Sequence, residues 1–545
     1  MSGDDVQPDQ RGLGAADIGA AVILAVMAPL VTLWPIGADA LIAAPGQEAP
    51  EHLAGLWLAA QSGDWLVVET GLLAWPEGER LVLIDPLNLL IFRPLAAWPI
   101  LAFNAVLWAG CAFGGLAGAL LSREGGGRLW VGALLGATAG PLGAMAAEGQ
   151  TEAFTLPWAA LHLVALLAFT RSGGLGRGVI AALTLAACFY GGPYTGIFAA
   201  LGAAGVGLWW LKRRPTVLAV GLLAVVLAAP MAWATLTQRD EGLPGSASRA
   251  QIPEPETDPE GFRGGLAHGA DLSDAWAPLA LTGAAPHVGH SVYVGLGLWL
   301  IALVGLVRAP RLWPWMLGAV VFTALAWGPW LLWRGEVLRL GEARLRGPVG
   351  ALMGVFPPAQ RLNRWYRAGV VAGFLLLPLA AAGLRRRGRL PLELLTPLLA
   401  ADALWGGPAR WPRAEIAPRL AGEAHAWEGP ILEVPAVTTA SRAQAPGGEN
   451  LLLLPLHGEP ISSSFLGLQP PIAERPDYLT LRDRVRRGAD PAPALEALSA
   501  QGFRTLWWST EHSPLSAPAR EAITTSLGPP IHEAGGVLVW SLAPR

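Results

Sequence analysis

The sequence has little charge for its length. Only 14% of its 545 residues are charged and 53% are hydrophobic, with a mean hydropathy of +0.42. Lys212 is the only lysine, and the net charge is −3. This composition excludes an ordinary soluble globular protein and is typical of a polytopic membrane protein. Because the net charge is small, we expect no nucleic acid or other polyanion as a partner.

Reactive residues and short catalytic motifs are also scarce. The two cysteines, Cys111 and Cys188, lie in apolar runs, which excludes a disulfide framework and a metal-thiolate site. The chain has no P-loop, no GxGxxG after a strand and no GxSxG elbow. It therefore lacks the signatures of P-loop NTPases, dinucleotide-binding domains and α/β-hydrolases.

Long apolar runs are what the sequence does contain. A helix needs about 20 apolar residues to cross ~30 Å of hydrocarbon. Eleven runs approach this length: 17–35, 95–121, 129–147, 152–170, 178–191, 194–211, 215–236, 290–307, 312–333, 366–384 and 390–406. No small-residue cleavage site follows the first run, so we expect it to be retained as a span.

The arginine-bearing turns predict an orientation. "SREGGGR", "RSGGLGR", "KRRP", "RAPR" and "RRRGR" fall at alternate turns, and cytoplasmic loops retain positive charge. With the N-terminus in the cytoplasm and a hairpin at "YGGPY", all five lie inside. The arginine-rich, Ala- and Gly-rich composition fits a GC-rich bacterial genome, so the membrane is predicted to be the bacterial inner membrane. Loops 36–94, 237–289 and 334–365, the turn at Glu148 and the C-terminal tail then face outward.

The first outer loop is predicted to contain a helix. In "PEHLAGLWLAAQSG", Leu53, Leu56, Trp57 and Ala60 recur at helical spacing, whereas His52 falls on the other side. This pattern predicts a helix lying along the membrane interface. Further on, "DPLNLLIFRPL" begins a second such helix or the approach to span two.

The composition changes to that of a soluble protein from about residue 410. Short β-like runs occupy 431–436, 505–509 and 537–542. Between them, "PDYLTLRDRVRRG", "DPAPALEALSAQG" and "SAPAREAITTSLG" have the proline starts and glycine stops of helices. We therefore expect a transmembrane domain over 1–409 and a small extracytoplasmic α/β domain over 410–545.

Candidate functional side chains gather at the outer rim. Ionisable groups at membrane depth are costly, and the spans are nearly free of them. The rim candidates are Asp39, Glu48, Glu51, His52, Glu69 and Asp85 in loop one, Glu148 and Glu152 at the next outer turn, His287 and His290 before span eight, and Arg361, Arg364 and Arg367 before span ten. The two histidines are three residues apart without a nearby carboxylate or cysteine, which gives little support to a metal site.

Each of these residues also has a purely structural interpretation. Glu51 follows Pro50 and suits the first turn of a helix, where the dipole favours a carboxylate. His52 is compatible with an interfacial side chain, and Glu148 with the cap of the next span. Arg364 and Arg367 are either interface anchors or phosphate ligands.

The layout resembles the GT-C superfamily of membrane glycosyltransferases, which take sugars from polyprenyl-phosphate carriers on the outer face. It is similar in the long acidic first loop, the tight turn "AEGQTEAFTLPW", the segment "HSVYVGLGLWLIALVGL", the approach "FPPAQRLNRWYRAG" and the C-terminal domain with "GPILEVPA" and "LPLHGEPISSS". The resemblance implies an all-α polytopic membrane protein of about 11 transmembrane helices with a small C-terminal α/β extracytoplasmic domain.

The resemblance also implies site residues. In that superfamily the catalytic acid lies in the first outer loop, often as one of a pair. Here the acids are unpaired: Glu51 or Glu48 matches best by position, with Asp39 as runner-up. Substrate-binding roles fall to His52, Asp85, Glu148, Glu152, Arg364, Arg367 and His290. No cofactor is implied, although a divalent metal is compatible.

The implied reaction is a single displacement from a polyprenyl-phosphate-linked sugar to a glycan, lipid or protein acceptor, with membrane lipids around the spans. Two alternatives stay open. One is a lipid or glycan transporter, which would normally show charges or broken helices near the bilayer midplane. The other is a non-catalytic GT-C-like protein that binds lipid or partners, because fold alone does not establish activity.

Overall fold

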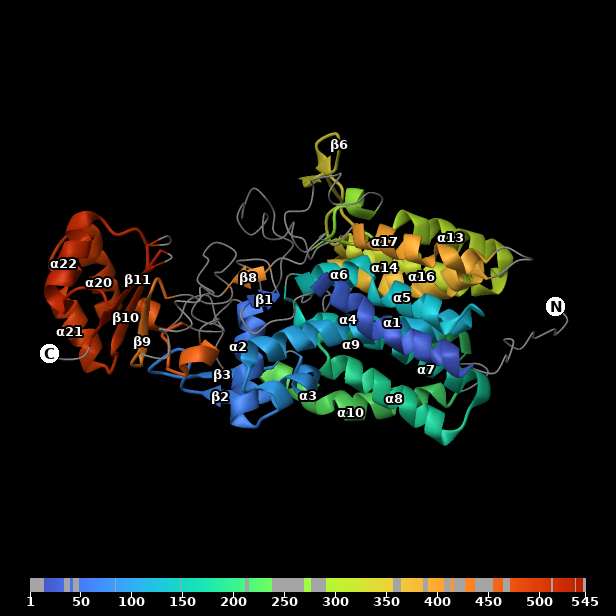
Figure 1. Ribbon diagram of the computed structural model, residues 1–545, viewed down its shortest axis with the longest axis horizontal. Coiled ribbons are helices and arrows are strands. Elements are labelled where there is room, and N and C mark those ends of the chain that lie inside the picture. The colour runs from blue at the N-terminus through green and yellow to red at the C-terminus, as the bar shows by residue number, and fades with distance from the viewer. Residues whose placement is uncertain are drawn as a thin grey trace.

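The computed structural model consists of a helical bundle joined to a small α/β domain at one end (Figure 1). It describes residues 14–33, 40–42, 49–83, 85–147, 149–210, 215–237, 269–275, 291–355, 364–385, 391–405, 413–415, 427–436, 454–463, 471–510, 513–534 and 536–542. We call the end of the bundle that faces the α/β domain the domain end.

Each of the eleven predicted ranges contains a helix. The helices are α1 (Ala15–Leu33), α4 (Pro99–Glu124), α5 (Leu129–Ala137), α6 (Gly140–Ala147), α7 (Pro157–Ser172), α8 (Leu175–Tyr190), α9 (Pro193–Trp210), α10 (Val217–Thr237), α13 (Leu296–Arg308), α14 (Trp313–Ala326), α16 (Ala368–Leu384) and α17 (Thr396–Trp405). The predicted hairpin at "YGGPY" is confirmed, because α8 ends at its first residue, Tyr190, α9 begins at Pro193, and the two helices pack together.

The count of eleven spans is not confirmed. Among the described residues, three helices are long and apolar enough to cross a membrane: α4, α10 and the helix that contains α16. The number is four if α5 and α6, which meet at a 40° bend, form one broken span. Helices α7, α13, α14 and α17 are shorter than the apolar runs that predicted them, because turns, 3₁₀ segments and, after α14, a strand occupy the ends of those runs.

Helix α16 is the centre of the bundle. All of its residues are buried, as expected for a helix that is apolar on every side. Around it, α4 and α5 approach closely through Gly114 and Gly118 on α4 and Gly132 and Gly136 on α5. A Cβ at Gly118, Gly132 or Gly136 would overlap a backbone carbonyl of the facing helix. This small-xxx-small packing brings backbones together where lipid supplies no hydrophobic driving force.

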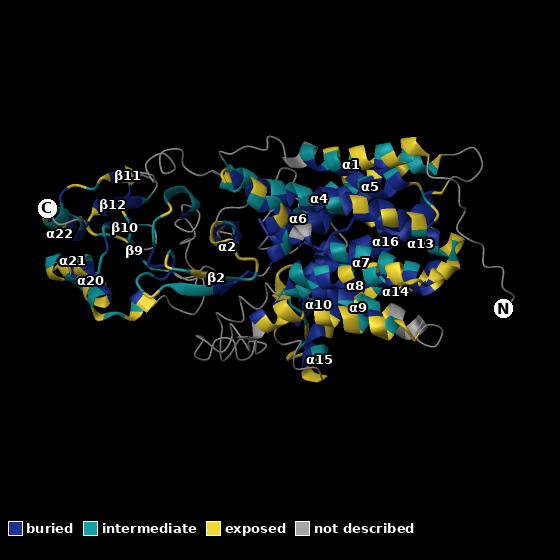
Figure 2. Ribbon diagram, turned by 90° about the horizontal axis from the view of Figure 1, so that it is seen from below, coloured by how far each residue is buried: buried dark blue, intermediate teal, exposed yellow. Residues whose placement is uncertain are grey.

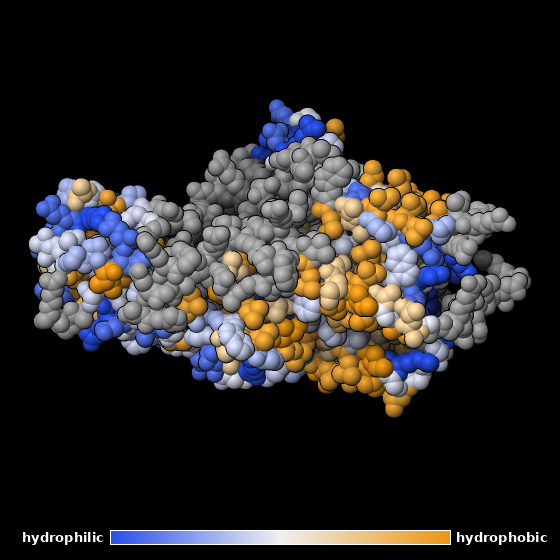
Figure 3. All heavy atoms as spheres, viewed as in Figure 1, coloured by the Kyte–Doolittle hydropathy of each residue, from blue (hydrophilic) through white to orange (hydrophobic). Residues whose placement is uncertain are grey.

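The outside of the bundle is apolar. Exposed side chains run along α8 and α10 in Figure 2, and they include Leu175, Leu222, Val225 and Trp233. Figure 3 shows hydrophobic residues over the bundle, whereas the α/β domain is largely hydrophilic. Such a surface suits contact with lipid and would be unfavourable in water.

Loop one is folded. It contains β1 (Ala40–Ile42), α2 (Ala49–Ser62), β2 (Val67–Thr70), β3 (Glu79–Val82), the 3₁₀ turn η1 (Pro86–Asn88), α3 (Leu89–Phe92) and η2 (Arg93–Leu95), which leads into α4. The predicted helix and the predicted approach to span two are thus present. The interfacial placement is wrong, because residues 52 to 59 of α2 are all buried within the protein. Both faces of α2 pack against protein, so the polar face does not meet solvent.

Two small hairpins follow α14, within and beyond the predicted range 312–333. They are formed by β4 (Leu332–Trp333) with β5 (Glu336–Val337), and by β6 (Arg339–Leu340) with β7 (Ala343–Arg344). Helix α15 (Pro348–Val355) comes next. Leu332 and Trp333, which the sequence placed at the end of a span, form β4 of the first hairpin.

The C-terminal domain has a four-stranded sheet in the order β11-β12-β10-β9. The predicted strands are β9 (Ile431–Val434), β10 (Thr505–Ser509) and β12 (Val537–Ser541), and β11 (His532–Ala534) was not predicted. Strand β9 is parallel to β10, and the other neighbours are antiparallel. The predicted helices are α20 (Pro476–Arg487), α21 (Ala492–Ala500) and α22 (Ala517–Leu527).

Loop one is hydrogen-bonded to the C-terminal region at two places, which we call the clasp. Strand β1 pairs with β8 (Arg413–Glu415). The Ala74 and Trp75 amides donate to the carbonyls of Ser463 and Ile461, and the Ile461 amide donates to Leu72. Segments separated by almost 400 residues therefore share backbone hydrogen bonds.

Candidate active site

A buried polar cluster lies at the domain end of the bundle. Four short segments supply it: the first turn of α2, η1, the 3₁₀ turn η3 (Thr151–Phe154) that precedes α7, and the 3₁₀ turn η8 (Trp365–Arg367) that begins α16. At chain turns the backbone need not continue a helix, so polar side chains from several segments can point at one another. The ionisable members are His52, Asp85, Glu152 and Arg367, and each is at most 6% exposed.

His52 and Asp85 are joined through a threonine. The Thr151 hydroxyl lies 2.7 Å from Nδ1 of His52 and donates to Oδ2 of Asp85. A hydroxyl has one proton, so Nδ1 of His52 must carry the hydrogen in the bond to Thr151. Asn88 adds a 2.7 Å hydrogen bond to the same Asp85 oxygen and donates to the Thr151 carbonyl at 3.1 Å. Three segments are thereby fixed to one carboxylate.

Glu152 connects His52 to Arg367. Nη1 of Arg367 donates to Oε1 of Glu152 at 2.8 Å, and Oε2 of Glu152 lies 3.5 Å from Nε2 of His52. The guanidinium of Arg367 also sits over the Tyr194 ring, 4.7 Å from its centroid. Asp85, His52, Glu152 and Arg367 thus form a row of alternating charge when His52 is protonated, and we call this row the charge array.

The environment favours the protonated form of His52. Burial on its own would lower the pKa of His52, but the charge of Glu152, followed by the hydrogen bond and charge of Asp85, raises it above the usual 6.5. Burial would likewise raise the pKa of Asp85, yet its hydrogen bond and charge interaction with His52 hold the pKa below 3.8. Both shifts therefore favour an ion pair inside the protein.

Tyrosines line the cluster on the side of α9 and α16. The Tyr194 hydroxyl accepts a 3.0 Å hydrogen bond from the Arg364 amide, and Nη1 of Arg364 donates to the Tyr366 hydroxyl at 3.4 Å. Gln150 donates to the same hydroxyl at 2.8 Å. Arg364 is therefore positioned beside Arg367, with phenol groups between the two cations.

The structure brings together four of the predicted site residues and places two more beside them. His52, Asp85, Glu152 and Arg367 form the charge array, and Arg364 adjoins it. Glu51, which is half-buried, precedes His52 on α2 and contributes to the electrostatic field at that residue. Predicted residues that lie outside the described residues are Asp39, Glu48, Glu148, His287, His290 and Arg361.

Two structural interpretations of the sequence are wrong, and one rim candidate lies apart from the cluster. His52 and Arg367 are not interfacial side chains, because both are buried in the charge array. Glu69 is 81% exposed and lies 3.8 Å from Arg80, away from the cluster. His52 and Arg367 are buried and Glu69 is exposed, and the positions of charged residues in the sequence do not show this difference.

The neutral members of the cluster, Asn88, Gln150 and Thr151, were not among the predicted site residues. Asn88 and Gln150 carry no charge that would attract notice, although Asn88 interrupts the apolar run "LNLLIF". Thr151 suits a helix cap by its place in the chain, but its hydroxyl is used by His52 and Asp85 instead. A polar residue inside a short apolar turn is the one local signal that points to such a role.

The cluster has the chemistry of proton and anion handling. Arg364 and Arg367 offer donors for a phosphate. No group of three or more His, Cys, Asp or Glu side chains within the described residues is placed to hold a metal ion.

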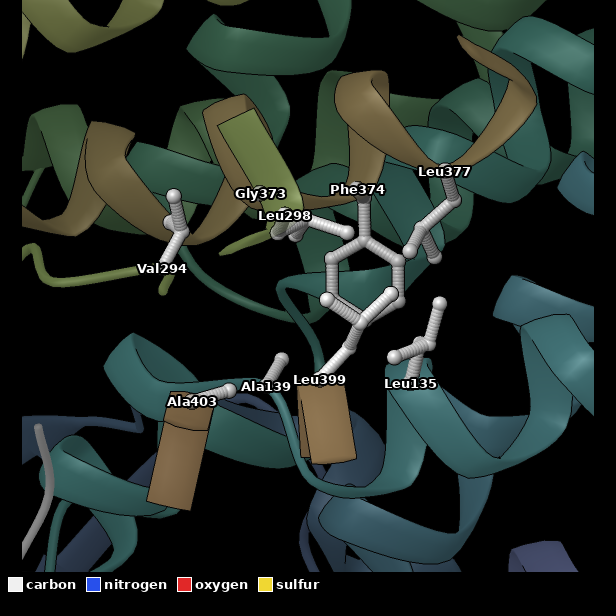
Figure 4. Close-up of a pocket in the computed structure, with 9 residues that line it drawn as sticks. All are labelled: Leu135, Ala139, Val294, Leu298, Gly373, Phe374, Leu377, Leu399 and Ala403. Atoms are coloured by element: carbon white, nitrogen blue, oxygen red, sulfur yellow. The ribbon is translucent and has the colours of Figure 1, made fainter. Parts of the chain in front are cut away.

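An apolar crevice lies deeper in the bundle, between α5, α13, α16 and α17. Its volume is about 10 Å³, and Figure 4 shows the residues that line it: Leu135, Ala139, Val294, Leu298, Gly373, Phe374, Leu377, Leu399 and Ala403. Ala139 stands at the break between α5 and α6. Gly373 is six residues beyond Arg367, which is about 9 Å along a helix. The crevice therefore begins close beneath the charge array and has no polar side chain in its lining.

Solved structures provide the comparisons. The mycobacterial arabinofuranosyltransferase AftD is 14% identical, with a TM-score of 0.53, over 98% of this chain and 40% of its own. The oligosaccharyltransferase AglB from Archaeoglobus fulgidus, in complex with an inhibitory peptide and a dolichol-phosphate, is 12% identical, with a TM-score of 0.51, over 91% of this chain and 70% of its own. ArnT from Cupriavidus metallidurans, bound to undecaprenyl phosphate, is 13% identical over 96% and 98%, with a TM-score of 0.42.

The chain spans less than half the length of AftD. No protein-family model matches it, and no curated protein sequence matches it. At these identities the comparisons establish architecture alone. The buried apolar bundle, the folded first loop and the neighbours AftD and AglB together show that the chain has the fold of the GT-C glycosyltransferases.

Proposed function

We propose that the chain is a membrane glycosyltransferase that moves a sugar from a polyprenyl-phosphate-linked donor to an acceptor on the outer face of a bacterial inner membrane. The observation that carries this proposal is the charge array at the domain end of a GT-C bundle. Four buried ionisable groups are costly to maintain, and strongly perturbed groups gather at functional sites.

The donor phosphate would bind Arg367 and Arg364. Arg367 is held by Glu152 and the Tyr194 ring, so its guanidinium is fixed before a ligand arrives. As the sugar leaves, the polyprenyl phosphate gains negative charge, which a preorganised cation stabilises. Arg364, beside it, supplies a second cation for the same phosphate.

A loop-one carboxylate would act as the base. Glu152 already serves as the counterion of Arg367. Glu51 lies in the first turn of α2, directly before His52 of the charge array. The carboxylate takes the proton of an acceptor hydroxyl, whose oxygen forms a bond to the anomeric carbon. The bond from that carbon to the phosphate oxygen breaks, and polyprenyl phosphate departs. General base catalysis of this kind contributes about 100- to 10,000-fold.

The polyprenyl chain would lie against the apolar outer surface of the bundle, because the crevice, at about 10 Å³, has no room for an isoprenoid. This arrangement also requires the domain end to face outward, with about eleven helices crossing the membrane and the C-terminal domain, 410–545, outside.

The experiment is donor turnover in proteoliposomes. Purified full-length protein is given polyprenyl-phosphate-linked hexose and pentose donors, and released polyprenyl phosphate is measured. Glu51→Gln is expected to abolish release, whereas Glu69→Gln, an exposed acid of the same loop, leaves it unchanged. Unchanged turnover in Glu51→Gln moves the base to Asp39 or Glu48. Unchanged turnover in Arg367→Gln would contradict the proposed centre itself.

The loop-one sequence has no paired-acid motif, since two residues separate Glu48 from Glu51, and this favours one second candidate, a GT-C-like protein that binds lipid or partners without catalysis. It predicts saturable binding of the polyprenyl-phosphate sugar with no release of polyprenyl phosphate from any donor. The same proteoliposomes distinguish the two, because binding and release are measured on one sample.

A further inference from the structure

The C-terminal domain contains an open groove that the proposed reaction does not use. It lies between α20 and the segment 513–516 that leads into α22, and it has a volume of about 430 Å³. Trp508, near the carboxyl end of β10, contributes to its lining. In sheets with parallel strands, ligands bind beyond the carboxyl ends of the strands. The volume lies in the lower part of the range for small-molecule sites, about 300 to 1,000 Å³.

One wall of the groove is cationic. Leu479, Arg482, Asp483 and Arg486 lie at helical spacing on the solvent side of α20, opposite the core residue Leu481. Asp483 forms ion pairs with Arg486 at 3.1 Å and with Arg487 at 3.0 Å, so the charge of its carboxylate is compensated within the helix. The guanidinium of Arg482 lies 5.9 Å from the centroid of a buried tyrosine ring, which helps to orient it.

The opposite wall carries hydroxyl groups. Ser513, Pro514 and Ser516 line it. Ser516 is also the N-cap of α22, since its side chain accepts from the Ala519 amide. Indole Nε1 of Trp508 donates to the Ser513 carbonyl at 2.7 Å, which holds this wall against the sheet. The two walls are therefore fixed by the fold.

The lining combines three chemistries. It has guanidinium groups that pair with carboxylate or phosphate, hydroxyls that exchange hydrogen bonds with other hydroxyls, and apolar patches from Leu479 and Pro514. A sugar ring has an apolar face and a hydroxyl edge. A sugar that also bears an acid matches all three parts of the lining, whereas an apolar ligand would leave both arginines unused.

We propose that this groove binds a saccharide that carries a carboxylate or phosphate group. This binding does not depend on the transferase reaction. Where that reaction also holds, the groove selects an acidic glycan as the acceptor and retains it near loop one.

The test is direct binding to the full-length protein in nanodiscs, measured by calorimetry. The probes are a short oligogalacturonate and the same oligomer with its carboxylates methyl-esterified. The free acid is expected to bind saturably and the ester about tenfold or more weakly, because hydrogen bonds to charged groups are among the strongest. A phosphorylated disaccharide distinguishes phosphate from carboxylate as the preferred acid.

Variants of α20 give the matched controls. Arg482→Gln and Arg486→Gln each weaken binding by about tenfold. Arg484→Gln has little effect, because it removes the same charge from the same helix, where Arg484 donates to the Asp490 carbonyl and does not line the groove. Equal weakening by Arg484→Gln, equal affinity for acid and ester, or no saturable binding would each overturn the proposal. Loss of oligogalacturonate binding on adding phosphatidylglycerol to the nanodiscs would assign the groove to lipid headgroups and overturn it too. Since the assay needs no turnover, its outcome is independent of the Glu51→Gln experiment.

Discussion

Replacing Glu152 by glutamine should destabilise the protein strongly while changing its shape very little. The side chains of Glu152 and Arg367 are only 4% and 2% exposed, and they meet at 2.8 Å. The glutamine keeps the volume but leaves the guanidinium of Arg367 buried without its carboxylate. Removing one partner of a buried pair costs about 3 to 5 kcal/mol in the free energy of unfolding.

A double-mutant cycle isolates the interaction. Arg367→Gln should cost as much as Glu152→Gln for the mirror-image reason. The double variant removes both charges, so its cost should be smaller than the sum by about 2 to 3 kcal/mol, near the upper end of measured coupling energies. Glu69→Gln is the control, because its partner Arg80 lies 3.8 Å away at an exposed site, where such pairs contribute about 0 to 1 kcal/mol.

The measurement is unfolding of the detergent-solubilised protein along a gradient of sodium dodecyl sulfate, followed by tryptophan fluorescence. The reasoning is refuted if each single change costs less than about 0.5 kcal/mol, as for an ordinary surface substitution, and the two costs simply add. In that event the array would not be a buried ion pair in the protein, and the anion site built on Arg367 would lose its support.

Three further predictions concern the site and its surroundings. The pKa of His52 is raised in the folded state, so protonated His52 stabilises the protein fully below the usual pKa of 6.5, and this stabilisation is lost as pH rises through the folded-state pKa. The unfolding midpoint of the wild type should therefore fall with rising pH above 6.5, whereas that of His52→Gln should not. Identical pH profiles would contradict a protonated His52 in the charge array. Ala139→Phe, which puts a ring into a crevice of about 10 Å³, should lower the free energy of unfolding by about 1 to 3 kcal/mol through overpacking, and an unchanged free energy of unfolding would contradict close packing at the bend between α5 and α6. Glu77→Ala, which removes the ion pair to Arg475, should accelerate amide hydrogen exchange at Trp75 in the clasp, and unchanged exchange would show that the backbone bonds hold alone.

The positions of the helices could be predicted from the sequence because lipid imposes a composition on each one. Apolar runs located every long helix of the bundle, and proline starts and glycine stops located α20 and α22. The lengths could not be predicted equally well. Helix α14 ends at Ala326, before the end of range 312–333, because Gly328, with φ of 72°, takes the chain out of the helix, and the apolar residues that continue the run form β4.

The candidate site was predicted as residue types but not as an arrangement. His52, Asp85, Glu152 and Arg367 are separated by up to 315 positions, and no local pattern indicates which acid meets which cation. The periodicity of α2 placed His52 on a polar face and thus in solvent. It is buried because η1 and η3 present polar groups to that face, a fact of tertiary packing.

The clasp makes loop one and the C-terminal region a single mechanical piece. Strand β1 is completed by β8, and the amides of Ala74 and Trp75 find their acceptors only beyond residue 460. Replacing the C-terminal region by that of a relative would therefore leave these donors and acceptors without their partners unless loop one were replaced together with it. Recombination at about residue 410, where the composition changes, would separate two segments that are joined by backbone hydrogen bonds.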